Sequence, residues 1–506
     1  MKYTIVTLLL IASNILAATN KPDTVNVQVS AWESPWRSYS NYFDYNPSAT
    51  FAVPVEKYTE VGGSYMFSNS EKGYHLVQEG SGSSVFKLHS ESFQVDSCYR
   101  FFGNAYYSNH QKFNVGWRDV EDYDLLNPYL VADSVGGTYN GESYFLSGGA
   151  SIRLRNMEWA IRASYQGDVS YRQVDPRPRN TTSVIHINPG VTYHRGNWSY
   201  GLFADYIRYR QNVDIQVEKA DRKIYFYLLQ GFGIYNRQFS VFDESYSRIY
   251  KGNLFNAGIH VNNYSNGQSN GALIELKTAA IQVDESDKRT PYKLNHYEIL
   301  SQLTHERELF HRNLFLKGIY SYHQAIGNET QYTPVTINTN FIEWQFATQS
   351  DRYQSITQDA QFSALLADKN LSEFSVWERI DGGWHDSRQN YYYPDYHQNV
   401  QDATASGTVG FNCPIKKGVL EGSIQGGYKK NIESGLLQNE NNIITTQMLL
   451  PDYAFLTSDV SFYKLNMKFR FPIHRGLLLN VSADAALQKA KEQKAFSSGI
   501  NIALNF

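Results

Sequence analysis

The sequence predicts an all-β fold, a transmembrane antiparallel up-and-down β-barrel of about 18 strands. Three observations lead to this prediction. Long stretches of the chain alternate apolar and polar side chains, as strands with one apolar and one wet face do. The connectors between these stretches alternate between short turns and long loops, which is typical of barrels that span a membrane. Aromatic residues make up 15% of the chain although the mean hydropathy is only −0.47, as expected where every strand has one polar face.

Residues 1–18 are expected to be a secretory signal peptide. Lys2 precedes an apolar run from Ile5 to Ile11, and the small residues Ala17 and Ala18 offer a cleavage site. The apolar run is too short to cross a membrane, and no later run of about 18 apolar residues follows it. The exported chain is therefore expected to be either a soluble protein or a barrel.

Residues 19–56 are predicted to be an extension that forms no strand. They contain four prolines, alternate poorly, and include the turn Asn46-Pro47-Ser48-Ala49. This turn resembles the Asn-Pro-Ala segment that precedes the first strand of fatty-acid-transporter-like barrels, where the extension forms a hatch inside the barrel. The extension is thus either such a plug or a periplasmic leader without fixed structure.

Residues 57–506 are predicted to form the barrel. An even number of strands is required if both ends lie in the periplasm, and counts from 14 to 18 fit the alternation. The strands are expected near residues 57–69, 83–95, 98–117, 142–155, 156–175, 180–194, 197–212, 250–264, 269–285, 291–305, 311–325, 352–367, 370–384, 403–416, 418–434, 457–472, 475–489 and 495–506. The long connectors between them are expected at 118–141, 213–249, 325–351, 385–402 and 435–456.

The alternation also predicts which side chains face the lumen. Arg or Lys at the lipid midplane costs about 2–4 kcal/mol, so charged residues belong on the inner face. Mixed charge on that face indicates a wet interior or salt-bridged packing against a plug, or it only stabilises the lumen. The lumen-facing candidates are Arg162, Asp168, Arg172, His296, Glu298, Lys464, Lys468, Arg470 and Asp484. One strand, 197–212, is ambiguous, because Phe203 and Ile207 are out of phase.

The last stretch ends on Phe506 after the alternating residues Ile500, Ile502 and Leu504. It resembles the C-terminal strand of bacterial outer-membrane β-barrels. The resemblance implies that the protein lies in the bacterial outer membrane, in contact with lipid and lipopolysaccharide. It also implies that Phe506 is the insertion signal that the barrel-insertion machinery reads.

Two other stretches, 117–137 and 171–180, resemble an uncharacterised family of outer-membrane barrels from Bacteroidota, a domain of unknown function. In the second stretch, Pro176 and Pro178 are expected to stop strand pairing, because proline has no N–H to donate. Arg177 and Arg179 would then sit on a stiff turn at the outer rim. They either contact lipopolysaccharide phosphate or a partner, or are simply solvated.

The loop at 213–249 is unusually apolar, with Phe226, Leu228, Leu229, Phe232 and Tyr235. An exposed apolar patch marks a binding surface for a ligand or a partner. The loop could also fold over the lumen as a lid, bury a core of its own, or extend a strand.

No motif predicts catalysis, so the protein is not expected to be an enzyme or to need a cofactor or metal. His305-Glu306 lacks the second histidine of a zinc motif, and no Gly-x-Ser-x-Gly elbow occurs. The net charge of −3 argues against nucleic-acid binding. The two cysteines, Cys98 and Cys413, are expected either to remain separate thiols or to form a disulfide.

The sequence is compatible with two functions. The first is a passive channel or transporter for small molecules. The second is a scaffold subunit that conducts nothing and supports a larger outer-membrane secretion or nutrient-uptake complex. A transporter needs a continuous path through the lumen, whereas a scaffold can be filled throughout and should present apolar patches to an outer-membrane protein partner.

Overall fold

The computed structural model describes residues 24–506, apart from residues 41, 54, 72, 219–224, 241–245, 266, 339–340, 369–372, 417, 440, 475 and 492. The expected signal peptide lies outside these residues. In the described part of the chain, three short helical elements precede the first strand: α2 (Thr24–Trp32), α3 (Arg37–Ser40) and the 3-10 helix η1 (Ala49–Ala52). None of the helices in the described part of the chain is long and apolar enough to cross a membrane.

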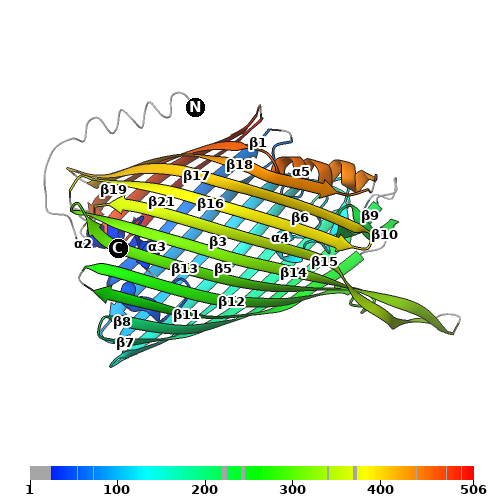
Figure 1. Ribbon diagram of the computed structural model, residues 1–506, viewed down its shortest axis with the longest axis horizontal. Coiled ribbons are helices and arrows are strands. Elements are labelled where there is room, and N and C mark those ends of the chain that lie inside the picture. The colour runs from blue at the N-terminus through cyan, green and yellow to red at the C-terminus, as the bar shows by residue number, and fades with distance from the viewer. Residues whose placement is uncertain are drawn as a thin grey trace.

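Within the described residues, eighteen antiparallel strands form one closed sheet, which confirms the predicted barrel and its strand number (Figure 1). Each strand pairs with the next one along the chain, and the first strand closes the ring by pairing with the last, Glu60 opposite Asn505. The strands are β1 (Lys57–Ser70), β2 (Gly82–Asp96), β3 (Tyr99–Val115), β5 (Gly137–Leu154), β6 (Met157–Arg172), β7 (Arg177–Arg195), β8 (Trp198–Gln216), β11 (Tyr246–Ser265), β12 (Gln268–Glu285), β13 (Tyr292–Leu309), β14 (Arg312–Asn338), β15 (Phe341–Ala367), β16 (Ser375–Tyr392), β17 (Asp395–Ile415), β18 (Gly418–Leu437), β19 (Val460–His474), β20 (Leu477–Ala490) and β21 (Gln493–Asn505).

The strands alternate between an apolar outer face and a more polar inner face. On β6, the outward side chains of Trp159, Ile161 and Tyr165 are about half exposed, whereas Arg162 between them points inward and donates to the backbone of the N-terminal residues. An apolar outer belt suits lipid, and closure leaves no strand edge unpaired in it.

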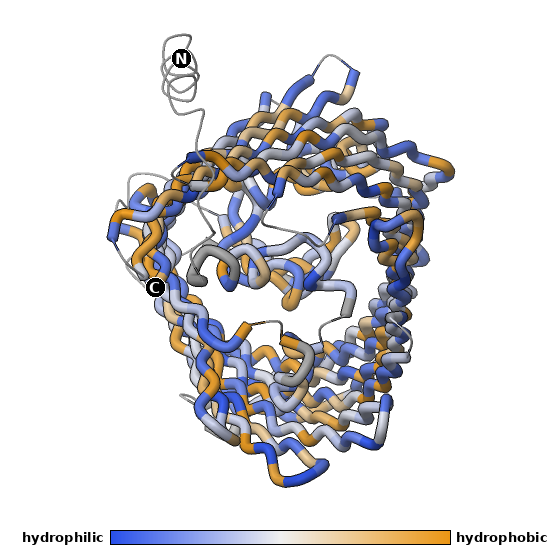
Figure 2. The backbone as a smooth tube through the Cα atoms, turned by 90° about the vertical axis from the view of Figure 1, so that its left-hand side faces the viewer, coloured by the Kyte–Doolittle hydropathy of each residue, from blue (hydrophilic) through white to orange (hydrophobic). Residues whose placement is uncertain are grey.

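The two ends of the barrel differ. Helices α2 and α3 lie at the end with the short turns, where the C-terminus also lies (Figure 1). The longer connections at the opposite end contain α4 (Tyr123–Leu126), β4 (Val131–Asp133), β9 (Tyr225–Gly231), β10 (Ile234–Ser240), the π-helical turn η2 (Thr445–Leu449) and α5 (Leu450–Leu456). A view along the barrel shows that part of the chain lies inside the ring of strands (Figure 2).

Two of the predicted loops were wrong. Residues 325–351 form the far halves of β14 and β15, and Figure 1 shows this hairpin projecting beyond the barrel. Residues 385–402 are also mostly strand, because β16 and β17 are joined by a tight turn at Tyr393 and Pro394. Both stretches are rich in polar residues and alternate weakly over most of their length, so the pattern did not reveal these strands.

Strand pairing does not stop at Pro178, contrary to the prediction. Strand β7 begins at Arg177, and Pro178 pairs with Ile215 of β8. On the other side of β7, pairing with β6 ends at Arg179. Pro178 therefore has a neighbouring strand on one side only, where a missing N–H is tolerated. The two cysteines are both free thiols.

Candidate functional site

The candidate site is the barrel lumen, which holds two groups of residues. The first is the N-terminal segment, here residues 28–56 as far as they are described. The second is the lid, here the described residues of 116–136, 225–236 and 438–459. The lid lies at the long-loop end and the N-terminal segment at the short-turn end (Figure 1).

Polar contacts join the N-terminal segment to strands far apart around the barrel. The Arg470 guanidinium of β19 donates to Ser30 Oγ at 2.7 Å, and Lys468 of the same strand pairs with Glu33. Tyr39 forms a 2.5 Å hydrogen bond with Ser363 of β15. On β6, the Arg162 guanidinium donates to the backbone oxygen of Phe43 at 2.7 Å. The segment therefore contacts opposite walls of the lumen.

The turn at Asn46, singled out in the sequence, is docked against β7 and β11. Ser48 N and Ser48 Oγ both donate to Asn46 Oδ1, at 3.0 and 2.7 Å, which closes the turn. Ser48 Oγ also lies 2.7 Å from Thr192 Oγ1 of β7. A Cβ at Gly190 of β7 would lie 2.0 Å from Asn46 Oδ1, so the turn fits only against a glycine here.

Apolar residues on the inner face explain the ambiguous strand. Phe203 of β8 points inward and packs with Tyr42, Ala49 and Leu273. A second apolar cluster joins Trp32 to Tyr58 and Phe93, and the rings of Trp32 and Tyr58 stack at 4.7 Å. The inner wall is therefore apolar where the N-terminal segment covers it, so the alternation breaks down at these positions.

The lid is built from three loops that are distant in sequence. Strand β4 pairs with β9, and β9 pairs with β10, so residues about 95 apart form one small sheet. The third loop joins through Asn442 Nδ2, which donates to the Gly233 carbonyl oxygen at 2.9 Å. A continuous apolar core links the lid to the inner wall, and the rings of Tyr129 and Tyr292 of β13 stack at 4.5 Å within it.

A buried charge cluster fixes the first lid loop to the end of β6. Arg172 donates to Asp133 Oδ2 at 2.5 Å and lies 3.6 Å from Asp119 Oδ1. The Tyr139 hydroxyl also donates to Asp119, at 2.9 Å. Burial and the neighbouring Asp133 raise the pKa of Asp119. Arg172, predicted to face the lumen, thus lies 98% buried beneath the lid.

The five apolar residues singled out in the 213–249 loop lie inside the lid and, in the described part of the loop, form no exposed patch among themselves. Phe226, Leu228 and Leu229 are buried in its core. Phe232 packs with Tyr353, Tyr391 and Tyr396 at the wall, and Tyr235 contacts Tyr227 edge-on at 5.3 Å. This arrangement fits two of the alternatives open in the sequence, a loop folded over the lumen and a loop that buries a core of its own.

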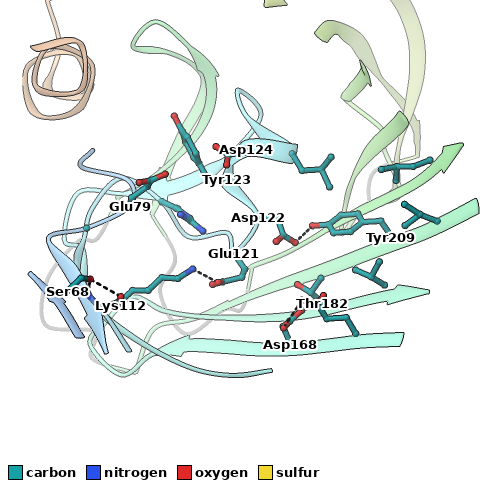
Figure 3. Close-up of a pocket in the computed structure, with 18 of the residues that line it drawn as sticks. Ser68, Glu79, Lys112, Glu121, Asp122, Tyr123, Asp124, Asp168, Thr182 and Tyr209 are labelled. Atoms are coloured by element: carbon teal, nitrogen blue, oxygen red, sulfur yellow. Dashed lines mark hydrogen bonds and ion pairs between the residues drawn. The ribbon is translucent and has the colours of Figure 1, made fainter. Parts of the chain in front are cut away.

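A cavity of about 740 Å³, called here the lid cavity, lies in the lumen beside the first lid loop. The loop contributes Glu121, Asp122 and Tyr123 to its lining, and the strand wall contributes Lys112 and Asp168 among others (Figure 3). Asp168 was predicted from alternation to face the lumen. The acidic lid residues were not predicted, although the run WRDVEDYD carries them, because nothing in the sequence shows that this loop turns inward.

The carboxylates of the lid cavity differ in their surroundings. Burial opposes the ionisation of Glu121, but Lys112 and Arg118 together hold its pKa at about 2. Asp122 instead accepts a 2.6 Å hydrogen bond from the Tyr209 hydroxyl. Burial and the nearby charges of Glu121 and Asp168 raise the pKa of Asp122. The cavity therefore concentrates negative charge close to an apolar wall.

A second cavity of about 490 Å³ lies along β14–β18, next to Tyr39 of the N-terminal segment. Two polar pairs lie in its wall. His385 Nδ1 lies 2.7 Å from Asp359, and Arg379 Nε lies 2.9 Å from Asp381. This cavity therefore offers a polar surface beside the segment, with acidic and basic side chains close together.

The remaining predicted residues lie at several places on the lumen and rim. His296 lies 3.1 Å from His323 and 3.2 Å from the Leu125 carbonyl oxygen of the lid, and Glu298 pairs with Lys277 at 2.9 Å. Lys464 shares the face of Lys468 on β19, and Asp484 of β20 lies opposite Asn466 on that face. At the rim, Arg177 pairs with Asp175 and Glu218, while Arg179 is exposed. Among the described residues, no group of three or more His, Cys, Asp or Glu side chains is arranged to hold a metal ion.

These features define the class of protein. A closed antiparallel barrel with an apolar outer belt and a polar interior is an outer-membrane β-barrel, and its place is the outer membrane of a bacterial cell. Residues 47–506 match the model of DUF6850, described as a family of unknown function. The chain belongs to this family, as the stretches at 117–137 and 171–180 suggested. Its origin in Bacteroidota and its likeness to fatty-acid-transporter-like barrels stay predictions.

Comparison with curated proteins finds no match. Among solved structures, CdiB from Acinetobacter baumannii is similar with a TM-score of 0.34 and 9% identity over 88% of this chain, which spans only 60% of CdiB. The unliganded ferric citrate transporter FecA gives a TM-score of 0.39 and 9% identity, over 89% of this chain and 79% of FecA. The alcaligin outer membrane receptor FauA from Bordetella pertussis gives 0.35 and 11%, over 90% and 76%. Similarity at this level carries no information about cargo.

Proposed function

We propose that this protein is a gated transporter that moves small solutes across the outer membrane through its own lumen. One observation carries the proposal. The N-terminal segment and the lid lie inside the barrel at its two ends, and polar cavities lie beside them. A subunit that only supports other proteins has no need of polar, charged cavities in its interior. A solute path does need such space, together with an element that can move aside.

The N-terminal segment is the better candidate for the moving element. The lid is fixed by one continuous apolar core and by the buried Arg172 cluster. The N-terminal segment is held by smaller apolar clusters, by hydrogen bonds to the wall and by the ion pair of Lys468 with Glu33. Hydrogen bonds to the wall can be exchanged for hydrogen bonds to water at a net cost of about 0.5–1.5 kcal/mol each, so displacement of this segment costs less.

Single-channel conductance in planar bilayers tests the proposal. A mature chain without residues 19–56 is expected to conduct steadily, and the intact mature chain only briefly or at a lower level. Heat-modifiable gel mobility checks that both forms are folded barrels. Silence of both folded forms would contradict a path through the lumen.

A disulfide supplies a reversible version of the same test. Ser48→Cys and Thr192→Cys, in a Cys98→Ser, Cys413→Ser background, place two thiols where the hydroxyl oxygens now lie 2.7 Å apart. Oxidation is expected to tie the segment to β7 and to abolish the brief openings of the intact chain, and reduction to restore them. The Cys98→Ser, Cys413→Ser protein without the new pair is the control, and its openings should not change on oxidation or reduction. Openings that persist after complete oxidation would rule out this segment as the gate.

A scaffold subunit remains the second candidate, because of the β14–β15 hairpin. Beyond Glu329 and before Tyr353 its strands pair only with each other, and Phe346 is 64% exposed. Replacing residues 331–349 with a short turn tests this candidate. The scaffold function predicts that a larger native complex in the outer membrane, seen by native gel electrophoresis, is lost in this variant. The transporter function predicts unchanged conductance.

A further inference from the structure

We propose that the lid cavity binds a small solute carrying amine groups, so that the path is selective for organic cations. This inference rests on the proposed transporter function, which it makes more specific. The cavity is the space described above, of about 740 Å³, and such a volume is typical of sites for small molecules.

The charges that line the cavity are not balanced. Five carboxylates line it, from Glu79, Glu121, Asp122, Asp124 and Asp168, against the two cations Lys112 and Arg118. Lys112 is already paired with Glu121. The Arg118 guanidinium donates to the backbone oxygens of Val120 at 2.8 Å and Gln78 at 3.2 Å. The two cations act mainly on Glu121, so the lining still carries three more carboxylates than cations.

Asp122 and Asp168 are the carboxylates best placed to meet a solute. Asp122 comes from the lid and Asp168 from the strand wall, so they approach the same space from two elements (Figure 3). The Tyr209 hydroxyl donates to Asp122, and Gln166 Nε2 donates to Asp168 at 3.0 Å, and both donors are neutral. Within the described part of the chain, neither carboxylate forms an ion pair. An ammonium group between them would supply the missing positive charge and charge-assisted hydrogen bonds.

A buried hydroxyl provides an independent indication of a ligand. Thr182 of β7 lines the cavity, directly opposite Asp168 in the strand register. Its side chain is 97% buried, and Thr182 Oγ1 has no hydrogen-bond partner among the described residues. A buried polar group without a partner is costly, and a solute that hydrogen-bonds to it would remove that cost.

The rest of the lining favours a body of methylene groups. Val184, Ile207 and Leu254 form an apolar side of the cavity next to the carboxylates. An alkyl diamine can place its chain on this side and an ammonium group between Asp122 and Asp168. A dicarboxylate of the same length would bring like charges together, and a diol would leave the carboxylates without a cation.

Binding is measured by calorimetry on the full mature protein in detergent at low salt, with three probes of equal length: 1,6-diaminohexane, 1,6-hexanediol and adipate. The diamine is expected to bind, and the other two to bind at least about tenfold more weakly. The diamine affinity should fall as sodium chloride is added, because salt screens the attraction. Equal affinities for the diamine and adipate would overturn the proposal.

Three variants locate the site. Asp168→Asn and Asp122→Asn should each weaken diamine binding about tenfold, and Thr182→Val, which keeps the side-chain shape, about threefold. Asp484→Asn, a lumen carboxylate outside the cavity, is the matched control and should bind as the parent does. Heat-modifiable mobility shows that each variant is folded. Unchanged binding in folded Asp168→Asn and Asp122→Asn would overturn the assignment.

Flux into proteoliposomes separates the site from the transport function. If uncharged solutes are taken up but binding shows no preference for the diamine, the transporter function stands and the cation site is excluded. If the diamine binds in a way that depends on Asp168 but no probe crosses the membrane, the cation site stands and the transporter function is excluded.

Discussion

Arg172 shows how a single buried charge holds the lid in the mouth of the barrel. Alternation places this residue on the inner face of β6, but its partners Asp119 and Asp133 lie on a loop and are not evident from sequence spacing. A buried ion pair contributes little by itself, whereas removal of one partner leaves the other charges buried and unpaired.

Arg172→Leu is expected to loosen the lid by about 3–5 kcal/mol, because Asp119 and Asp133 lose their cation. Hydrogen exchange of the Val131–Asp133 amides measures this change in local opening. Arg177→Leu is the control, since the Arg177 pairs are partly exposed and are expected to contribute only about 0–1 kcal/mol. Unchanged exchange in folded Arg172→Leu would show that the apolar core alone holds the lid.

Asp452 of α5 gives the lid a dependence on pH. Its carboxylate accepts a 2.6 Å hydrogen bond from Val77 N, but burial raises its pKa to about 7, and nearby Glu79 adds to the shift. The folded state thus holds this proton more tightly than the unfolded chain does. This contribution to stability is full at low pH and is lost as the pH rises through about 7.

Docking of α5 is therefore expected to be tighter at pH 5 than at pH 8 in the parent protein, and to depend less on pH in Asp452→Asn. The asparagine Oδ1 can still accept from Val77 N, and it carries no charge. Limited proteolysis within residues 442–457 at the two pH values measures the effect, and Asp459→Asn is a control on the same loop. An equal pH dependence in Asp452→Asn would assign the titration to another group.

At the scale of elements, the contact between the N-terminal segment and β7 depends on the absence of a side chain. Gly190 leaves space for the Asn46 turn, and the side chain of Asn46 also lies 3.0 Å from His260 Nε2. Glycine in a strand interior indicates close approach of another backbone, so the sequence carried this signal. Which element approaches could not be predicted, because the two residues are 144 positions apart.

Gly190→Ala is expected to displace the Asn46 turn and to increase the conductance of the intact mature chain toward that of the form without residues 19–56. Gly407→Ala is the matched control, because a Cβ at that strand glycine meets nothing within 4 Å. Planar-bilayer recordings of the intact chain, the form without residues 19–56 and the two alanine variants make the comparison. If both alanine variants conduct as the parent does, the turn tolerates the added methyl group and is not the sensitive point of the segment.

At the scale of the whole molecule, the barrel could be predicted from the sequence, but the arrangement of the lid and of the N-terminal segment inside it could not. Strand number and inward faces follow from local alternation, which each strand carries by itself. The lid and the N-terminal segment depend on contacts across the lumen, such as Asn442 with Gly233 and Ser30 with Arg470. The local sequence pattern contains no information on such pairs. Asp168, which lies on a strand, was therefore predicted to face the lumen, whereas Asp122, which lies on a lid loop, was not.

The predicted insertion signal concerns the whole molecule as well. Phe506 is exposed at the end of the chain, and its N–H donates to the Thr59 carbonyl oxygen of β1 at 3.1 Å. Phe506→Ala is expected to lower the amount of folded barrel in the outer membrane severalfold, measured by heat-modifiable mobility of membrane fractions. Phe496→Ala, on the outer face of the same strand, controls for loss of an aromatic ring. An equal loss in both variants would indicate general destabilisation instead of a terminal signal.

The pairing of β1 with β21 has a consequence for assembly. The ring cannot close until the last strand has been delivered, because residues 60–70 pair with residues 495–505. The N-terminal segment, made first, touches β6, β7, β11, β15 and β19 on the inside. The simplest order of events is that the sheet curls around a segment that is already seated, with no later threading through a finished pore. Residues 28–56 would then meet the inner face of these strands before the wall closes.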